Sequence, residues 1–199
     1  MSSTHDPDLA DVLDAHKAIT TALPSITVKS FFERCHAALE APNTPNPSHQ
    51  SQRILVCEHI NEGLRVTTAA SPGLARLANA FGRLAPKLAW QRREGLQAKD
   101  PCFAGNHANA TLIGHDGLEH HHSVRLGVSL LAPGVEYPDH QHPPEEGYLV
   151  MSGGDWRQDH GKWVRRDPGD TVHNVPNIWH AMRAGEAPLL ALWMLWTGD

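Results

Sequence analysis

Apolar residues recur every three or four positions through roughly the first hundred residues, which is the spacing of amphipathic helices. The runs lie at 9–19, 28–39, 48–67, 74–84 and 88–96. Pro24 is placed to end the first helix, and the proline-rich segment 41–48 cannot be helical because proline lacks a backbone donor. We therefore expect residues 1–105 to form an α-helical N-terminal extension.

After Asp100 and Pro101 the pattern changes to short apolar runs separated by Gly, Pro, Asn and Asp, which is typical of strands and turns. The expected strands are 110–113, 124–131, 146–151, 155–158, 162–165, 171–175, 181–184 and 189–196. The segment Asp159-His160-Gly161 has the composition of a hairpin turn. Many short strands at this spacing predict a barrel or sandwich over residues 106–199, with the helices packed on it.

Charge and composition narrow the classes of partner. The net charge is −5 and the basic residues are scattered, which argues against a nucleic-acid-binding protein. The short basic cluster Gln91-Arg92-Arg93-Glu94 is interpreted as a solvated helix face. No apolar run is long enough to span a bilayer and the first residues lack a signal-peptide pattern, so we expect a cytoplasmic protein without a membrane partner. A monomer and a homodimer both remain open.

Histidine and cysteine usage points to a metal site without thiolates. The three cysteines are widely spaced and odd in number, whereas histidine occurs 15 times. His140 and His142 stand two apart, as do Glu146 and Tyr148 after a double proline, and alternate residues of a strand share a face. We expect two adjacent antiparallel strands to aim these groups into one cavity, joined by His180. Such a mixed imidazole and carboxylate set suits one divalent transition metal ion: iron, zinc, manganese or nickel.

The two tyrosines of the chain, Tyr137 and Tyr148, both lie in this same segment. A nearby metal ion can lower the pKa of a phenol far enough to make it a base near neutral pH. Their placement therefore indicates proton abstraction.

The segment resembles the first motif of the cupin superfamily, which Gly134, His140, His142, Glu146 and Gly153 match without a gap. The second cupin motif is matched more loosely. Pro168-Gly169-Asp170 and His180 fit it, but Asn177 replaces the usual glycine, a change that asparagine tolerates because it adopts left-handed turns. The resemblance implies a mainly β fold, with a C-terminal cupin (jelly-roll) barrel.

The order Tyr137, His140, His142, Glu146, Tyr148 and then a distal His180 is similar to that of the cupin-type dimethylsulfoniopropionate (DMSP) lyases, particularly the short Q-type. This resemblance implies that both histidines, the glutamate and the distal histidine bind the metal. It implies that Tyr148 is a metal-associated base and that Tyr137 is a further catalytic or substrate-orienting group, without deciding which takes the proton.

The implied reaction is β-elimination of the zwitterion DMSP to dimethyl sulfide and acrylate. Aromatic faces would stabilise the sulfonium by cation–π attraction, and the candidates are Trp179, Trp193 and Trp196.

Two other functions remain open, because the same ligand set occurs in enzymes of many chemistries. One is another metal-dependent cupin enzyme, a dioxygenase or isomerase, and the other is a non-catalytic ligand-sensing cupin. The run His120-His121-His122 is expected to be a solvated loop or a lid over the barrel mouth, and Arg125 and Arg183 are expected to face outward.

Overall fold

The N-terminal half is helical, and local capping explains where its helices begin. A computed structural model describes residues 5–41, 43–93 and 101–198. Its helices are α1 (Pro7–Thr21), α2 (Ile26–Ala38), α3 (Ile60–Ala70), α4 (Pro72–Leu84) and the short α5 (Pro101–Gly105), with 3₁₀ turns at Leu55–His59 and Ala85–Lys87. The Asp6 carboxylate caps α1 and the Ser71 hydroxyl caps α4, each just before a proline in the first helical position.

Two of the predicted helices are wrong in part. The helix expected over 48–67 starts only at the 3₁₀ turn Leu55–His59, and residues 88–93 of the run 88–96 are not helical. The backbones of these two segments instead bond to each other, with Gln52 N donating to Leu88 O (3.1 Å) and Trp90 N to Gln52 O (2.9 Å). Long-range pairing thus replaces the local helix, and residues 94–96 lie outside the described ranges.

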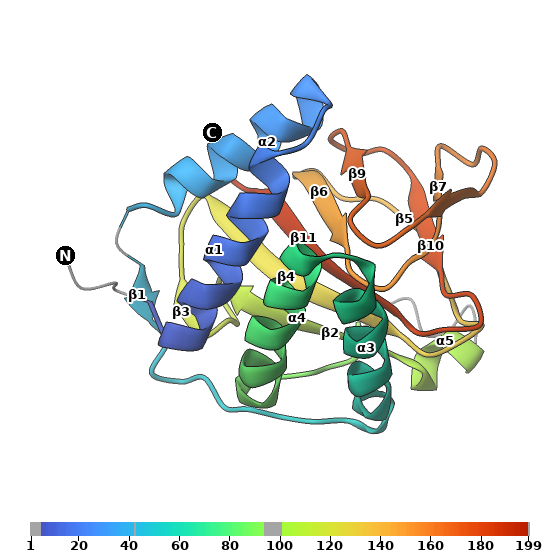
Figure 1. Ribbon diagram of the computed structural model, residues 1–199, viewed down its shortest axis with the longest axis horizontal. Coiled ribbons are helices and arrows are strands. Elements are labelled where there is room, and N and C mark those ends of the chain that lie inside the picture. The colour runs from blue at the N-terminus through green and yellow to red at the C-terminus, as the bar shows by residue number, and fades with distance from the viewer. Residues whose placement is uncertain (1–4, 42, 94–100, 199) are drawn as a thin grey trace.

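The strands form two sheets that face each other (Figure 1). All eight strands expected from the apolar runs are present, and β5 (Glu136–His140) matches the strand expected at the first histidine of the motif. In the described ranges, the short strands β1 (Thr44–Pro45) and β3 (Glu119–His120) were not predicted. The larger sheet has the order β1 (Thr44–Pro45), β3 (Glu119–His120), β2 (His107–Ile113), β4 (Val124–Leu131), β11 (Leu189–Trp196), β6 (Glu145–Val150) and β9 (Thr171–Asn174). The smaller sheet has the order β5 (Glu136–His140), β10 (His180–Arg183), β7 (Gly154–Gln158) and β8 (Val164–Arg166).

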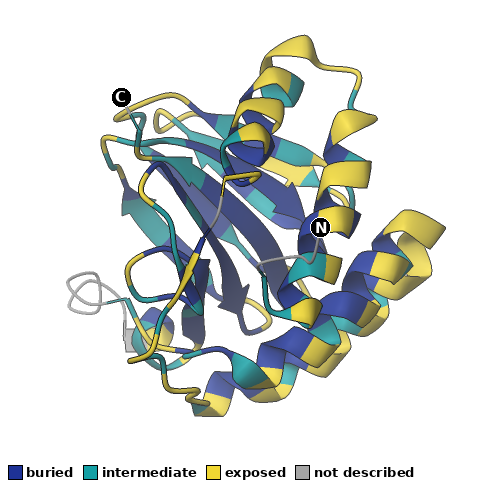
Figure 2. Cartoon of the chain, turned by 90° about the vertical axis from the view of Figure 1, so that its left-hand side faces the viewer, coloured by how far each residue is buried: buried dark blue, intermediate teal, exposed yellow. Residues whose placement is uncertain are grey.

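Helices α1 to α4 cover the outer face of the larger sheet, so its central strands are buried on both sides (Figure 1). The short α5 lies elsewhere, against β5. Figure 2 shows exposed residues on the outer surfaces of the covering helices and buried ones where they meet the strands. Gly147 of β6 lets α2 pack closely on the sheet, because a Cβ there would lie 2.6 Å from the Phe31 ring of α2. Helices and strands share one continuous core, and the division at residue 105 stays a prediction.

Turns that need a left-handed backbone occur where the sequence predicted them. Asp159 and His160 have φ values of 50° and 55°, which gives the hairpin between β7 and β8 its twist. Asn177 has φ 61° and so accommodates the turn where cupins usually have glycine. The two facing sheets and the helical N-terminal layer confirm the expected mainly β, cupin-type barrel. None of the helices in the described ranges is long and apolar enough to cross a membrane.

Candidate active site

The predicted metal ligands come from both sheets. His140 ends β5 and pairs directly with His180, the first residue of β10, with ring centroids 4.1 Å apart. His142 lies in the connection that follows β5, and Glu146 lies on β6 in the larger sheet. The expectation that the two motif strands are neighbours is therefore wrong. β5 ends at His140, and the chain crosses to the opposite sheet through residues 141–144, whose two prolines cannot donate to a strand ladder.

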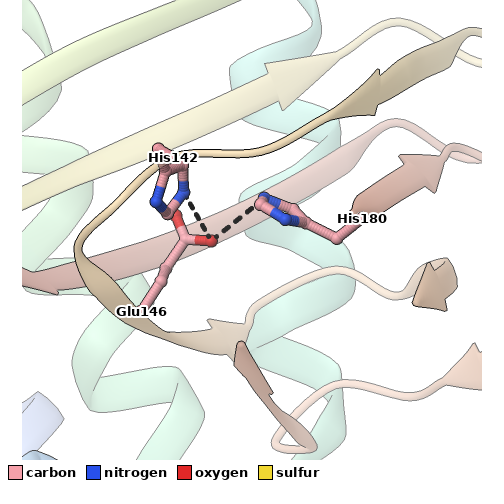
Figure 3. Close-up of side chains that lie close together, drawn as sticks. All are labelled: His142, Glu146 and His180. Carbon is pink, nitrogen blue, oxygen red and sulfur yellow. Dashed lines mark ion pairs between the residues drawn. The ribbon is translucent and has the colours of Figure 1, made fainter. Parts of the chain in front are cut away.

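Two of these histidines, His142 and His180, converge on one carboxylate oxygen of Glu146 (Figure 3). Nε2 of His142 lies 3.4 Å from Glu146 Oε2, and Nε2 of His180 lies 3.3 Å from the same atom. Within the described ranges, no other group of three histidine, cysteine or acidic side chains brings its donor atoms within 4.8 Å of one another. His140 is outside this group of three, with its ring against that of His180.

Backbone hydrogen bonds hold His140, His142 and His180 by Nδ1 and leave Nε2 of each ring free to face the site. Nδ1 of His140, His142 and His180 lies 2.9–3.0 Å from the backbone carbonyls of Pro138, Pro144 and Ile178 respectively. A carbonyl can only accept, so each Nδ1 carries the proton and each Nε2 presents a lone pair. Histidines that bind metal are fixed in this way by their second nitrogen.

The donor set fits a divalent transition metal ion. Nε2 of His180 is buried and has no hydrogen-bond partner, yet it faces Glu146 Oε2 with lone pair against lone pair. Burial raises the pKa of Glu146, and protonated His142 and His180 would outweigh this effect and hold it well below its ordinary value. When both imidazoles are neutral, a cation takes the place of those protons. Burial, together with His180, lowers the pKa of His140 to about 3, which keeps that imidazole neutral. A cation bound by the Nε2 lone pairs and the carboxylate removes the repulsion between them.

Both tyrosines line the same cavity as His142 and Glu146, a space of about 390 Å³. Tyr148 lies on β6 two residues after Glu146, and burial and that carboxylate raise its pKa well above the ordinary value. Tyr137 lies on β5 with its ring 4.6 Å from that of His140. Burial raises the pKa of Tyr137 as well, but the Arg93 guanidinium, which donates to its hydroxyl at 2.9 Å, opposes the rise.

The three candidate tryptophans are in different surroundings. Trp193 of β11 lines the cavity, and its indole lies over Gly127 on β4, where a Cβ would come within 2.1 Å of the ring. Trp179 does not line the cavity and its ring lies 5.6 Å from that of His160. Trp196 is also absent from the lining and contacts the Arg34 guanidinium, 4.6 Å from the ring.

Several polar residues near the site were missed or misplaced. Arg93 is not on a solvated helix face but lines the cavity and contacts Tyr137, which stands 44 positions away and gives no local signal. Arg125 also lines the cavity, against expectation, and donates to Asp116 at 3.2 Å. Asn174 donates to Glu146, and its place opposite that residue follows from strand register, which the sequence does not reveal.

The remaining candidates lie away from the cavity. Arg183 does not line it and donates to Asp155 at 2.9 Å. His121 accepts from the backbone of Ser123 and Val124, while its other nitrogen faces a carbonyl of α2. The loop expected over 120–122 is wrong for His120, which belongs to β3. The run is at least partly exposed and borders a separate hollow rather than the barrel mouth.

Comparison with known proteins finds relatives of this chain in sequence. Residues 28–191 match the profile of the dimethylsulfoniopropionate lyase family. The chain is 37% identical over 98 residues to dimethylsulfoniopropionate lyase DddQ of Ruegeria pomeroyi, covering 49% of this chain and 48% of that protein. It is 28% identical over 129 residues to a putative dimethylsulfoniopropionate lyase DddL of Cereibacter sphaeroides, covering 62% and 51%. The matched region thus spans about half the length of these curated relatives.

The structural comparison extends over nearly the whole chain. The crystal structure of the DMSP lyase DddQ from Ruegeria pomeroyi superposes with a TM-score of 0.73 at 25% identity, covering 98% of this chain and 93% of that one. A structure from a crystallographic study of the DMSP lyases RdDddP and RnDddQII gives a TM-score of 0.71 at 24% identity, covering 95% and 92%, and supports the fold alone.

Proposed function

Because this chain belongs to the dimethylsulfoniopropionate lyase family, we propose that it is a carbon–sulfur lyase that cleaves DMSP to dimethyl sulfide and acrylate. One observation carries the proposal: the convergent His142 and Glu146 share a single cavity with Tyr137 and Tyr148, the only tyrosines of the chain. A cavity of about 390 Å³ is at the small end of the range for ligand sites, in keeping with a small substrate.

We propose that His142, Glu146 and His180 hold one divalent transition metal ion and that His140, beside His180, completes the set. When bound, such an ion supplies Lewis acidity toward the substrate carboxylate and lowers the pKa of nearby phenols. The donor set suits iron, zinc, manganese and nickel.

Tyr148 is the proposed base. Its phenolate takes the proton from the carbon next to the carboxylate, the freed electron pair forms the carbon–carbon double bond, and the carbon–sulfur bond breaks. Dimethyl sulfide leaves with the bonding electrons, acrylate remains, and the tyrosine passes its proton to solvent. Tyr137, fixed by its hydrogen bond from Arg93, orients the substrate from the other side of the cavity.

The sulfonium is proposed to lie against Trp193. This indole is the one candidate tryptophan that lines the cavity, and it is only 9% exposed. A desolvated aromatic face attracts an onium group by roughly 0.5–2 kcal/mol. Gly127 leaves the space that the ring occupies.

We expect Gly127→Ala and Trp193→Leu each to raise KM for DMSP by roughly 2- to 30-fold, which is the range of a lost cation–π contact. The control is 4-methylpentanoate, in which an uncharged carbon replaces the sulfonium. Its inhibition constant should change far less in Trp193→Leu than KM for DMSP does. Equal weakening of both ligands would show that the indole acts only as packing.

The experiment that tests the proposed activity is headspace detection of dimethyl sulfide after incubation of metal-loaded protein with DMSP. We expect release above that of a sample stripped with a chelator, with acrylate formed in equal amount. No sulfide above the chelated control would refute the lyase. Oxygen uptake with another substrate would instead indicate a dioxygenase, and tight binding of DMSP without products a sensing protein.

A further inference from the structure

A pair of amide side chains joins the two sheets directly behind the candidate ligands. Asn174 of β9 stands opposite Glu146 in the strand register, is fully buried, and donates from Nδ2 to Glu146 Oε2 at 2.8 Å. Gln158 of β7 stands opposite His180 in the other sheet. Each amide therefore neighbours one ligand, and the two ligands belong to different sheets.

Hydrogen bonds fix which way each amide points. Nε2 of Gln158 donates to Asn174 Oδ1 at 2.6 Å and to the backbone carbonyl of His173 at 2.7 Å. Since the oxygen of the Asn174 amide is engaged by Gln158, its nitrogen must face Glu146. The orientation of Gln158 in the smaller sheet thus determines that Glu146 in the larger sheet faces the amide nitrogen of Asn174 rather than its oxygen.

We propose that Gln158 and Asn174 are positioning residues that set the spacing between Glu146 and His180, and so set the affinity for the metal ion. The inference rests on the proposed metal site. Glu146 Oε2 is the atom that both histidines approach, at 3.3 and 3.4 Å, and Asn174 holds that same atom. In the described part of the chain, the hydrogen bonds of the two amides go to Glu146, to the His173 carbonyl and to each other rather than to the imidazoles of His142 and His180. Each amide therefore acts through Glu146 and through the distance between the sheets.

The expected loss of metal affinity on removing an amide has two causes, the flexibility of the Glu146 side chain and the separation of the two sheets. Without the amide, the carboxylate can rotate away from the imidazoles, and the sheets lose a direct link at the level of the site. Loss of an outer partner of a metal ligand typically weakens metal binding 10- to 100-fold.

Two substitutions test the pair at different distances from the ligand. Asn174→Leu removes the donor to Glu146 while keeping the number and branching of the side-chain heavy atoms. Gln158→Glu leaves Asn174 in place but supplies only acceptors, which makes the Asn174 amide turn its oxygen toward Glu146. Asn43→Leu is the matched control, because the buried Asn43 also donates from Nδ2 to a buried carboxylate, Glu119 Oε2 at 3.1 Å, in another part of the molecule.

The measurement is the Kd for Zn²⁺, obtained by competition with a chromophoric chelator, together with the visible spectrum of the Co²⁺ form. We expect Asn174→Leu and Gln158→Glu to weaken Zn²⁺ binding 10- to 100-fold and to alter the Co²⁺ bands, with Asn43→Leu within about twofold of wild type. Circular dichroism and thermal unfolding establish that each variant is folded.

Zn²⁺ affinities within about twofold of wild type in both amide variants would overturn the inference, as would an equal loss in Asn43→Leu. If either amide variant fails to fold, the other decides. Wild-type protein that binds no stoichiometric Zn²⁺ would overturn the metal site and this inference together. Tight, amide-dependent Zn²⁺ binding without release of dimethyl sulfide would support the inference while refuting the lyase.

Discussion

Replacing Tyr148 by phenylalanine is expected to lower kcat for release of dimethyl sulfide by about 10²- to 10⁴-fold, the contribution typical of a positioned general base. The substitution removes a single oxygen from a buried ring that also packs 6.0 Å from Trp156, so the fold should persist. Metal content should stay stoichiometric, because His142, Glu146 and His180 remain. The measurement is initial-rate headspace analysis with the bound metal determined in the same samples.

Tyr137→Phe is the matched comparison, since it also removes one hydroxyl from a buried ring on the same cavity. Its hydroxyl accepts from Arg93, whereas that of Tyr148 lies near the carboxylate of Glu146. We expect a smaller loss of kcat and a larger rise of KM, as suits an orienting group. The reverse pattern would assign the base to Tyr137, and activity within a few-fold of wild type in Tyr148→Phe would exclude an essential role for it.

His142→Ala is expected to abolish stoichiometric metal binding and to reduce activity to that of the chelated wild type. His142 is one of three residues whose donor atoms lie within 4.8 Å of one another, and a small residue there leaves only two of them. The ring lies in the connection between β5 and β6 and is partly exposed, so little core packing is lost. Metal content by mass spectrometry and dimethyl sulfide release are measured after loading with excess metal.

His122→Ala is the control for this second prediction, because His122 is exposed and borders a different hollow. It should retain both metal and activity. His140→Ala addresses the fourth proposed ligand, which stands against His180 but outside the convergent group of three. We expect it to weaken metal binding measurably. Full metal occupancy in His142→Ala would contradict the assigned site.

Much of the site was accessible from sequence because its residues are close together along the chain. His140, His142, Glu146 and both tyrosines fall within a dozen positions, and their spacing is readable whatever surrounds them. The same holds for elements set by local rules: the capped helices α1 and α4, the strands β4 and β11, and the left-handed turn at Asn177. Periodicity and turn chemistry act over a few residues, so a single sequence records them.

Contacts between distant segments were decided only by the tertiary structure. The sequence could not show that β5 pairs with β10 rather than with β6, because strand pairing depends on backbone partners that the side-chain pattern does not encode. For the same reason it could not separate Trp193, which lines the cavity, from Trp196, three residues later on the same strand. The approach of Arg93 to Tyr137 is likewise a product of the packed fold. The sequence determined the chemical groups of the site, and the packing of the two sheets determined which groups meet.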